Sequence, residues 1–310
     1  MKACSRLFFA ALLALVLVPA HSREALPAAS AASAAAPAIR VVGDDGQAVQ
    51  LAAAPQRVVS MLPSLTESVC ALGACSRLVG VDRYSTWPAE LAALPRLGGG
   101  QDPDIEATLR LRPDLVLMPT GNARAAARLR ELGVPALALN MRDMAEVQRV
   151  LGLLEGVLQL PAGRAQQEWA RINAAVDAAA ASLPQRARGV RVFFEAAPGP
   201  WAAGEASFIG ELLARLGARN IVPAEMGPFP RLSPEFVLRA RPDVLIVPGR
   251  GMGSIPSRTY SYPGWQAMPA LREGRVCMFE GDESDTISRP SPRIAEAARL
   301  LAECLAKKAP

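Results

Sequence analysis

DIEATLRLRPDLVLMP, residues 104–119, recurs as SPEFVLRARPDVLIVP at residues 233–248. In each stretch a capping residue, Asp104 or Ser233, predicts the start of a short helix. The helix is expected to end at the Arg-Pro pair, because proline disfavours the helical region for the residue before it. The apolar run that follows Asp predicts a buried parallel strand. The sequence therefore contains one helix–turn–strand unit twice.

Two copies of this unit predict two similar α/β lobes. Residues 161–184 differ from both halves, because their Ala, Gln, Glu and Arg content favours one uninterrupted helix of about 30 Å. We predict an α/β fold of two similar lobes with central, mostly parallel sheets, joined by a single long α-helix, with a ligand cleft between the lobes. A continuous helix resists hinge bending, so only modest lobe motion is expected.

The start of the chain has the pattern of a cleavable secretory signal. Lys2 and Arg6 precede an apolar run at residues 7–18, which is too short to span a membrane comfortably. No Cys stands directly after that run, so no lipid anchor is expected. The sequence predicts a protein exported to the periplasm. The predicted segments are a signal peptide (1–22), a disordered lead-in (23–38), an N-terminal α/β lobe (39–160), the linking helix (161–184) and a C-terminal α/β lobe (185–310).

The residue content argues against an enzyme. The single histidine, His21, lies in the predicted signal, so the exported chain has no His-based metal site, Ser-His-Asp triad or Cys-His pair. Ser207 stands in GEASFIG and does not match the nucleophile pattern GxSxG. We expect no catalytic residue, no metal site and no catalytic cofactor. A receptor-type sensor built on the same fold is a further alternative.

Four cysteines follow the predicted signal, and export makes disulfides possible. They allow three pairings, and free buried thiols are an alternative. Pairing of Cys277 with Cys304 would join a late strand to the last helix. The other two cysteines are Cys70 and Cys75.

Removal of the predicted signal takes away Lys2 and Arg6 and lowers the formal charge from +5 to +3 (5 − 2). This charge is too small to indicate a nucleic-acid partner, and no basic run is interleaved with aromatic residues.

Three local patterns predict particular helix boundaries. Ser64 and Glu67 match a capping box, which would open a helix at Ser64. DESDTISRP, residues 282–290, is predicted to be a loop. Ser291 and Pro292 then form an N-cap and N1 pair that would open the final helix.

Aromatic residues follow predicted strands in both halves. Tyr84 and Trp87 lie just after the strand at residues 78–82, and Trp201 follows the strand at residues 190–195. Ligands of open α/β sheets bind beyond the carboxyl ends of the strands. Aromatic faces from the two lobes can clamp a broad apolar ring with few rotors to immobilise. The alternative is local packing beneath the loops.

From about residue 39 to residue 306 the chain resembles the periplasmic substrate-binding proteins of ABC importers for vitamin B12, iron-siderophores and haem, the helical-backbone type. The resemblance is greatest for the vitamin B12-binding members. It implies a protein that captures a ligand and delivers it to a permease and ATPase in the inner membrane, and we expect a monomer. Six motifs in order carry it: PQRVVSMLPSLTE, ALGACSRLVGVD, IEATLRLRPDLVL, LARLGARNIV, LSPEFVLRARPDVLIV and RPSPRIAEAARLL.

The resemblance implies roles for individual residues. Tyr84 matches a tyrosine that contacts the corrin, and Arg289 matches an arginine that reaches the ligand. The vitamin B12-binding members have a tryptophan within the stretch that is Gly98–Gln101 here, and a glutamate where this chain has Ser288. These two departures are consistent with a corrinoid variant or with another ligand. The implied ligand-binding residues are Tyr84, Trp87, Gly100, Trp201, Phe229 and Arg289.

Glu106 and Glu235 occupy equivalent positions in the two copies of the repeat, in the first turn of each predicted helix. A carboxylate is favoured there by the helix dipole, which explains it structurally. The resemblance further implies that these paired glutamates dock onto arginines of the membrane permease.

The ligand expected first is a corrinoid, vitamin B12 (cobalamin), which is a broad and mostly apolar ring. A ferric siderophore is often anionic and would need clustered cations. A haem would need an axial Tyr or His, and no histidine follows the signal. Candidates for the siderophore cations are Arg289, Arg83, Arg231 and Arg258, and candidates for the haem axial ligand are Tyr84, Tyr260 and Tyr262.

Overall fold

The computed structural model describes residues 39–197, 201–249 and 262–310. These residues form one compact unit. The predicted signal peptide and lead-in, together with Arg258 and Tyr260, lie outside the described residues. Among the described helices, none is long and apolar enough to cross a membrane.

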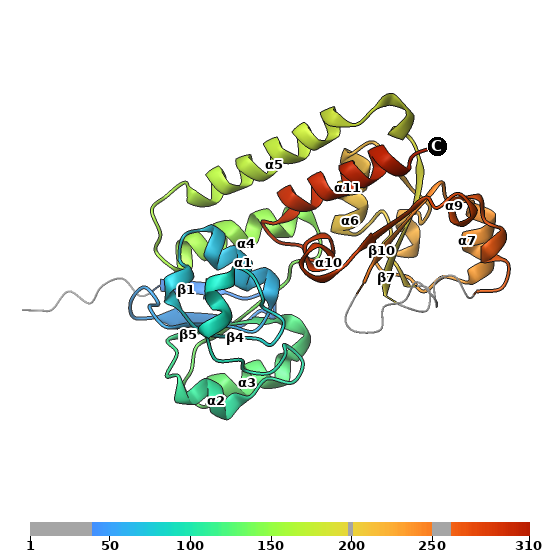
Figure 1. Cartoon of the computed structure of the whole chain (residues 1–310). Coiled ribbons are helices and arrows are strands. Elements are labelled where there is room, and N and C mark those ends of the chain that lie inside the picture. Colours follow the sequence, from blue (N-terminus) through green and yellow to red (C-terminus); the bar gives the residue numbers. More distant parts are fainter. Residues whose placement is uncertain (1–38, 198–200, 250–261) are drawn as a thin grey trace, which may run out of the picture. The chain divides into compact units, whose positions relative to one another are not determined.

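The first half is built on a four-stranded parallel sheet in the order β4-β3-β5-β6 (Figure 1). The apolar side chains of β5 and β6 are buried on both faces of the sheet, as in sheets covered by helices on each side. A two-stranded antiparallel hairpin precedes the sheet. The strands are β1 (Ile39–Val42), β2 (Ala48–Leu51), β3 (Val58–Ser60), β4 (Leu78–Val81), β5 (Leu115–Pro119) and β6 (Ala136–Leu139).

The second half has a five-stranded, mostly parallel sheet in the order β11-β10-β7-β8, with β9 paired to β7. Only the β7–β8 pair is antiparallel among the described pairs. The two sheets confirm the predicted fold class. The strands are β7 (Arg191–Ala197), β8 (Trp201–Ala202), β9 (Arg219–Asn220), β10 (Val244–Pro248) and β11 (Val276–Phe279).

Helices connect the strands and cover the sheets (Figure 1). Those of the first half are α1 (Pro63–Ala71), α2 (Ile105–Arg110), α3 (Ala123–Glu131) and α4 (Met144–Val157). Those of the second half are α6 (Phe208–Arg215), α7 (Pro234–Ala240), α9 (Pro269–Arg272), α10 (Gly281–Ser288) and α11 (Ile294–Lys308). The 3-10 turns are η1 (Cys75–Arg77), η2 (Ala89–Ala93), η3 (Thr120–Asn122), η4 (Gln185–Ala187), η5 (Ala224–Met226) and η6 (Trp265–Ala267).

A single unbroken helix, α5 (Arg164–Ser182), joins the two halves. Its 19 residues correspond to about 28 Å. Ile172, Val176 and Ala179 form its buried stripe, and the helix packs against α4 and runs beside α11 (Figure 1). The predicted linking helix is therefore confirmed as one continuous element.

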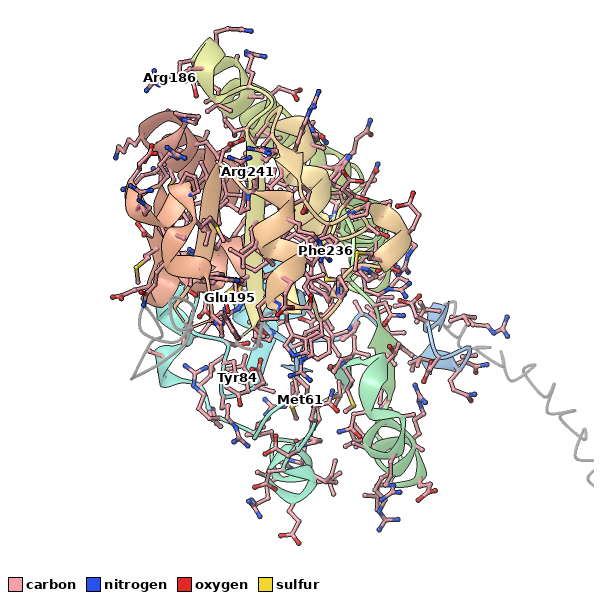
Figure 2. The ribbon with its side chains drawn as sticks, turned by 90° about the vertical axis from the view of Figure 1, so that its right-hand side faces the viewer. Met61, Tyr84, Arg186, Glu195, Phe236 and Arg241 are labelled. Carbon is pink, nitrogen blue, oxygen red and sulfur yellow. A yellow bond between two sulfur atoms is a disulfide. The ribbon has the colours of Figure 1, made fainter. Side chains whose placement is uncertain are left out.

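The two copies of the repeat have the same conformation. The carboxylate of Asp104 accepts a hydrogen bond from the Ala107 amide, and the hydroxyl of Ser233 accepts one from Phe236, which confirms both predicted caps. Arg112 and Arg241 both have a φ of 46° (Arg241 is labelled in Figure 2). The residue before each proline thus leaves the right-handed helix for the left-handed region.

The aspartate after each Arg-Pro pair has a structural role that was not predicted from the repeat. Asp114 accepts hydrogen bonds from the amides of Gln56 and Arg57, just before β3. Asp243 accepts hydrogen bonds from the amide and guanidinium of Arg191, at the start of β7. In each half the repeat therefore fixes the beginning of a neighbouring strand.

Three predicted helix boundaries are wrong. The first helix begins at Pro63 with Leu62 as its cap, so Ser64 lies inside it and makes no capping box with Glu67. The final helix begins at Ile294, after a turn in which the Ser291 hydroxyl accepts a hydrogen bond from the Arg293 amide. The predicted loop at residues 282–290 is mostly helix α10, and this change bears directly on the site.

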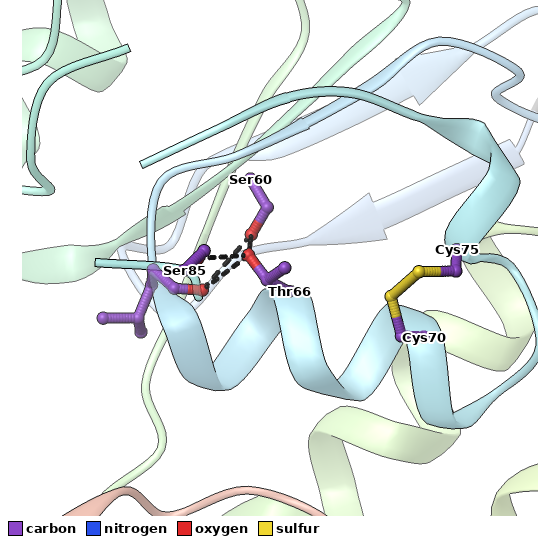
Figure 3. Close-up of a disulfide and its surroundings, with 6 residues drawn as sticks. Ser60, Thr66, Cys70, Cys75 and Ser85 are labelled. Carbon is purple, nitrogen blue, oxygen red and sulfur yellow. Dashed lines mark hydrogen bonds between the residues drawn. A yellow bond between two sulfur atoms is a disulfide. The ribbon is translucent and has the colours of Figure 1, made fainter. Parts of the chain in front are cut away.

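Two disulfides link the four described cysteines. Cys70–Cys75 joins the end of α1 to η1 (Figure 3). Cys277–Cys304 joins β11 to α11, so one of the pairings considered from the sequence is present.

We expect the two disulfides to stabilise the fold unequally. Their sequence separations are 5 and 27 residues, and a longer closed loop removes more entropy from the unfolded chain. Cys277→Ser with Cys304→Ser should lower the free energy of unfolding by about 3.5 kcal/mol, and Cys70→Ser with Cys75→Ser by about 2 kcal/mol. Denaturant unfolding measures both. Equal losses, or the reverse order, would contradict loop closure as the cause.

Candidate functional site

A cavity of about 1030 Å³ lies where elements of the two halves meet. Its volume is at the upper end of the range for small-molecule pockets, about 300–1,000 Å³. Its walls come from the start of α1, the loop after β4, the residue after β10, and α10 with the residues that follow it. The lining residues are Leu62, Pro63, Ser64, Tyr84, Thr86, Trp87, Ala89, Gly249, Gly281, Asp282, Asp285, Ser288, Arg289 and Pro290.

The loop that carries the first-half aromatics is held by buried hydroxyl groups. The hydroxyl groups of Ser85 and Thr66 share a hydrogen bond of 2.9 Å, and those of Thr66 and Ser60 share one of 2.8 Å (Figure 3). Asp82, at the end of β4, accepts hydrogen bonds from the Tyr84 amide at 2.7 Å and from the Ser85 hydroxyl. These bonds attach the loop to β3 and α1.

Tyr84 itself remains open to solvent. Its side chain is 57% exposed, and it is labelled in Figure 2. The Arg83 guanidinium lies 5.9 Å from the ring centroid and is ion-paired with Asp102. A Cβ atom at Gly99 would be 3.3 Å from the Tyr84 ring. The Gly98–Gln101 stretch therefore lies directly against this tyrosine.

Helix α10 supplies a polar face to the cavity. Asp282, Asp285 and Ser288 follow one another at intervals of three residues, which places them on one side of a helix. The Oγ atom of Ser288 is buried and has no hydrogen-bond partner among the described residues. The sequence reading missed these carboxylates, although the Asp-x-x-Asp-x-x-Ser spacing was a signal for a helix.

Arg289 connects the two halves beneath the cavity. Its guanidinium is 13% exposed and lies 3.1 Å from Glu67 on α1 and 2.6 Å from Asp285. It also donates to the Tyr84 carbonyl over 3.0 Å. The predicted ligand residue thus lines the cavity with its charge already engaged by two carboxylates.

Arg293 makes a second connection between the halves. It pairs with Asp282 at 2.5 Å and with Glu296 at 2.9 Å. Its guanidinium carbon lies 5.1 Å from the ring centroid of Trp87, which is half-buried in the cavity wall. The hydrogen bonds to Asp282 hold the pKa of that carboxyl below its usual range.

A smaller cavity of about 250 Å³ lies on the second half. Trp201 and Phe229 line it, and both are about 40% exposed. Ser288 lines both cavities, so the two are neighbours. Trp201 stands on the short strand β8, and an isolated bridge joins it to Arg231. Phe194, Ala196, Ala197 and Ile209 complete the lining.

The other predicted residues lie away from these cavities. Gly100 is half-buried beside Met61 and Pro119 and is not among the lining residues. Tyr262 packs on Trp265, with ring centroids 4.9 Å apart.

Glu106 and Glu235 lie on α2 and α7, in the first turn of each helix. The side chain of Glu106 is 88% exposed, and its nearest ionic partner is Arg110 at 3.8 Å. Glu235 is exposed, and a hydrogen bond from its own backbone amide lowers the pKa of its carboxyl, aided by Ser233. Both carboxylates face solvent.

Glu67 is the buried acid of the site. Its side chain is 1% exposed, and burial raises the pKa of its carboxyl, although Ser291, Arg289 and Arg293 act in the opposite direction. Asp82 behaves alike, since burial raises its pKa against hydrogen bonds from Ser85 and Tyr84. The predicted capping box assigned Glu67 to the start of a helix, so its burial at the site was not predicted.

We expect Glu67 to make stability depend on pH with a definite sign. A carboxyl whose pKa is higher in the folded state binds its proton more tightly there than in the unfolded chain. The stability of the wild type relative to Glu67→Gln should therefore be greatest below the unfolded pKa, about 4.3, and fall as the pH rises through the folded pKa. Denaturant unfolding of both proteins from pH 3.5 to 8 measures the difference. A difference that grows with pH would contradict a raised pKa.

Two known proteins are similar to this chain in sequence. A vitamin B12-binding protein of Pectobacterium carotovorum is 29% identical over 267 residues, covering 83% of this chain and 91% of its own. YvrC, an ABC transporter substrate-binding lipoprotein of Bacillus subtilis, is 25% identical over 320 residues, covering 98% of each chain.

Solved structures of similar proteins have the same fold. The periplasmic haem-binding protein RhuT of Roseiflexus sp. RS-1 superposes with a TM-score of 0.69 at 27% identity, covering 82% of this chain and 99% of that one. The vitamin B12-binding protein BtuF of Vibrio cholerae has the same fold, with a TM-score of 0.64 at 23% identity and coverages of 82% and 99%. The sequence model of the periplasmic binding proteins matches residues 58–282, from β3 into α10, and therefore spans both sheets and the linking helix. The chain belongs to the periplasmic binding protein family.

Proposed function

We propose that this protein captures a corrinoid, vitamin B12, in the periplasm and delivers it to the permease and ATPase of an ABC importer. The observation that supports this most is the 1030 Å³ cavity, with Tyr84 and Trp87 on its wall. A corrin is a broad, mostly apolar ring, and aromatic faces bind such a surface with little loss of rotamer freedom. Trp201 and Phe229, on the neighbouring cavity, supply aromatic faces from the other half.

The charges at the cavity also favour a corrinoid over an anionic siderophore. Arg289 and Arg293 are each held by two carboxylates, and Arg83 is paired with Asp102. Arginines that are already neutralised by neighbours attract an anion less strongly. Asp282 and Asp285 add negative charge to the wall.

Haem is the second candidate ligand, and a specific observation favours it. The Tyr84 phenol lies on the cavity wall and is accessible, as an axial ligand of haem iron must be. Tyr262, the other described candidate, packs on Trp265 and lines neither cavity. RhuT, at 27% identity, is named as a haem-binding protein.

An optical titration tests the proposal. The purified exported chain is titrated with cyanocobalamin, haemin and a ferric hydroxamate siderophore while tryptophan fluorescence is followed. Cyanocobalamin should quench it saturably, and Trp87→Phe should reduce the quenched amplitude. Trp169→Phe is the matched control, because Trp169 lies on α5 and lines neither cavity. Quenching by haemin or siderophore but not by cyanocobalamin would overturn the corrinoid assignment.

We also propose that Glu106 and Glu235 dock the protein on its permease, and that Tyr84, Trp87, Trp201, Phe229 and Arg289 bind the ligand. We propose that Gly100 contributes to the ligand site only as part of the Gly98–Gln101 stretch beside Tyr84. The segments 1–22, 23–38, 39–160, 161–184 and 185–310 are retained as the proposed signal peptide, lead-in, lobes and linking helix.

A further inference from the structure

We propose that Arg293 is a positioning residue for the ligand: it packs over the Trp87 ring and fixes the ring's orientation in the cavity wall. The inference rests on the proposed ligand-binding function of that cavity. Arg293 is not itself among the residues that line the cavity. Its effect on a ligand would therefore pass through the lining residues that it contacts, Trp87 and Asp282, and we assign it to Trp87.

The guanidinium of Arg293 is held by its neighbours without any ligand. The residue is 4% exposed. Its two terminal nitrogens donate to the two oxygens of Asp282 over 2.7 and 2.5 Å, and its Nε donates to Glu296 over 3.1 Å. A planar fork with bidentate carboxylate bonds has little freedom to rotate. The Arg293 side chain is therefore held in one conformation.

Trp87 contacts this fixed cation and also lines the cavity. The guanidinium carbon is 5.1 Å from the indole centroid, within the distance of a cation–π contact. The same residue lines the large cavity together with Asp282. A buried cation on one side of the ring holds it in one orientation, and less freedom is then lost when a flat ligand binds.

The contact also joins the two halves of the chain. Trp87 follows β4 in the first sheet, whereas Arg293 caps α11 in the second half. Asp282 lies in the first turn of α10, so its bidentate bond with Arg293 links the starts of α10 and α11. Arg293 therefore positions Trp87 relative to the α10 face of the same cavity.

A double-mutant cycle between Arg293 and Trp87 tests this inference. Arg293→Met and Arg293→Lys are made in the wild-type and Trp87→Leu backgrounds. Lysine keeps the charge for Asp282 and Glu296 but lacks the planar fork, and it serves if Arg293→Met folds poorly. Arg299→Met is the matched control, because Arg299 is on the same helix in an exposed pair with Glu303. Two readouts are used: near-ultraviolet circular dichroism of the ligand-free protein, and affinity for cyanocobalamin and haemin.

Arg293→Met should change the near-ultraviolet circular dichroism of the ligand-free protein. It should also lower the affinity for whichever of cyanocobalamin and haemin binds the wild type about tenfold. Arg293→Lys should have an intermediate effect, and Arg299→Met none. In the Trp87→Leu background neither the spectral change nor the loss of affinity should remain. Equal changes in both backgrounds would overturn the inference, because Arg293 would then act on the fold as a whole.

The two readouts separate this inference from the proposed function. If neither cyanocobalamin nor haemin binds, the proposed function fails, and the ligand-free spectra alone support or overturn the positioning of Trp87. If a probe binds wild type and Arg293→Met equally well, the positioning role is overturned and the proposed function stands.

Discussion

Replacing Glu106 and Glu235 together by alanine is expected to abolish ligand uptake by cells while leaving the affinity of the purified protein unchanged. The two carboxylates occupy equivalent places in the two copies of the repeat, each two residues after a helix cap. They are exposed and belong to neither cavity. The hydrogen bonds that lower the pKa of Glu235 favour the charged form of that carboxylate. A permease with two cationic sites would lose both contacts in the double variant.

The measurement pairs a transport assay with a binding titration on the same variants. Glu131→Ala with Glu303→Ala is the matched control, because these acids are also exposed on helices and paired with a nearby arginine. The control should keep both uptake and affinity. Each single variant should show a partial loss of uptake, since one lobe would still be docked. Full uptake by Glu106→Ala with Glu235→Ala, or a parallel loss of affinity, would rule out a docking role.

Local patterns in the sequence predicted the scaffold well. Caps such as Asp104 and Ser233 depend on hydrogen bonds to amides only three residues away, so the neighbouring sequence is sufficient to identify them. Apolar runs bounded by prolines gave β5 and β10, and an Ala-rich stretch without proline gave α5. The left-handed φ of Arg112 and Arg241 was not predicted, because proline only excludes the right-handed helix and does not choose the alternative.

The candidate site was harder to predict, because its key contacts are distant in sequence. Glu67 and Arg289 are separated by 222 residues, and the local Ser-x-x-Glu pattern suggested a cap instead. Polar residues such as Asp282 and Asp285 made α10 look like a loop, although their spacing fits one helix face. The candidate ligand-binding aromatics were predicted from strand ends and from family resemblance. How their rings are supported depends on packing between the halves, as Arg293 and Trp87 show.

Replacing Arg289 by methionine is expected to lower the free energy of unfolding by about 3–5 kcal/mol at pH 7. Glu67 is almost fully buried, and Arg289 is its ion-pair partner at 3.1 Å. Removing one partner of a buried pair leaves the other charge in a medium of low polarity. The variant also loses the hydrogen bond to the Tyr84 carbonyl, so affinity for the ligand should fall as well. Arg299→Met, in an exposed pair, should cost less than about 1 kcal/mol.

The pH dependence of this loss distinguishes a charge effect from simple loss of packing. Burial already raises the pKa of Glu67, and removal of the Arg289 cation should raise it further. A protonated Glu67 needs no counter-ion, so the destabilisation by Arg289→Met should shrink as the pH falls towards 4.5. Glu67→Gln with Arg289→Met should be less destabilised at pH 7 than Arg289→Met alone. A loss that is independent of pH and additive with Glu67→Gln would show that Arg289 stabilises the junction by packing alone, because a buried charge left unpaired must respond to both changes.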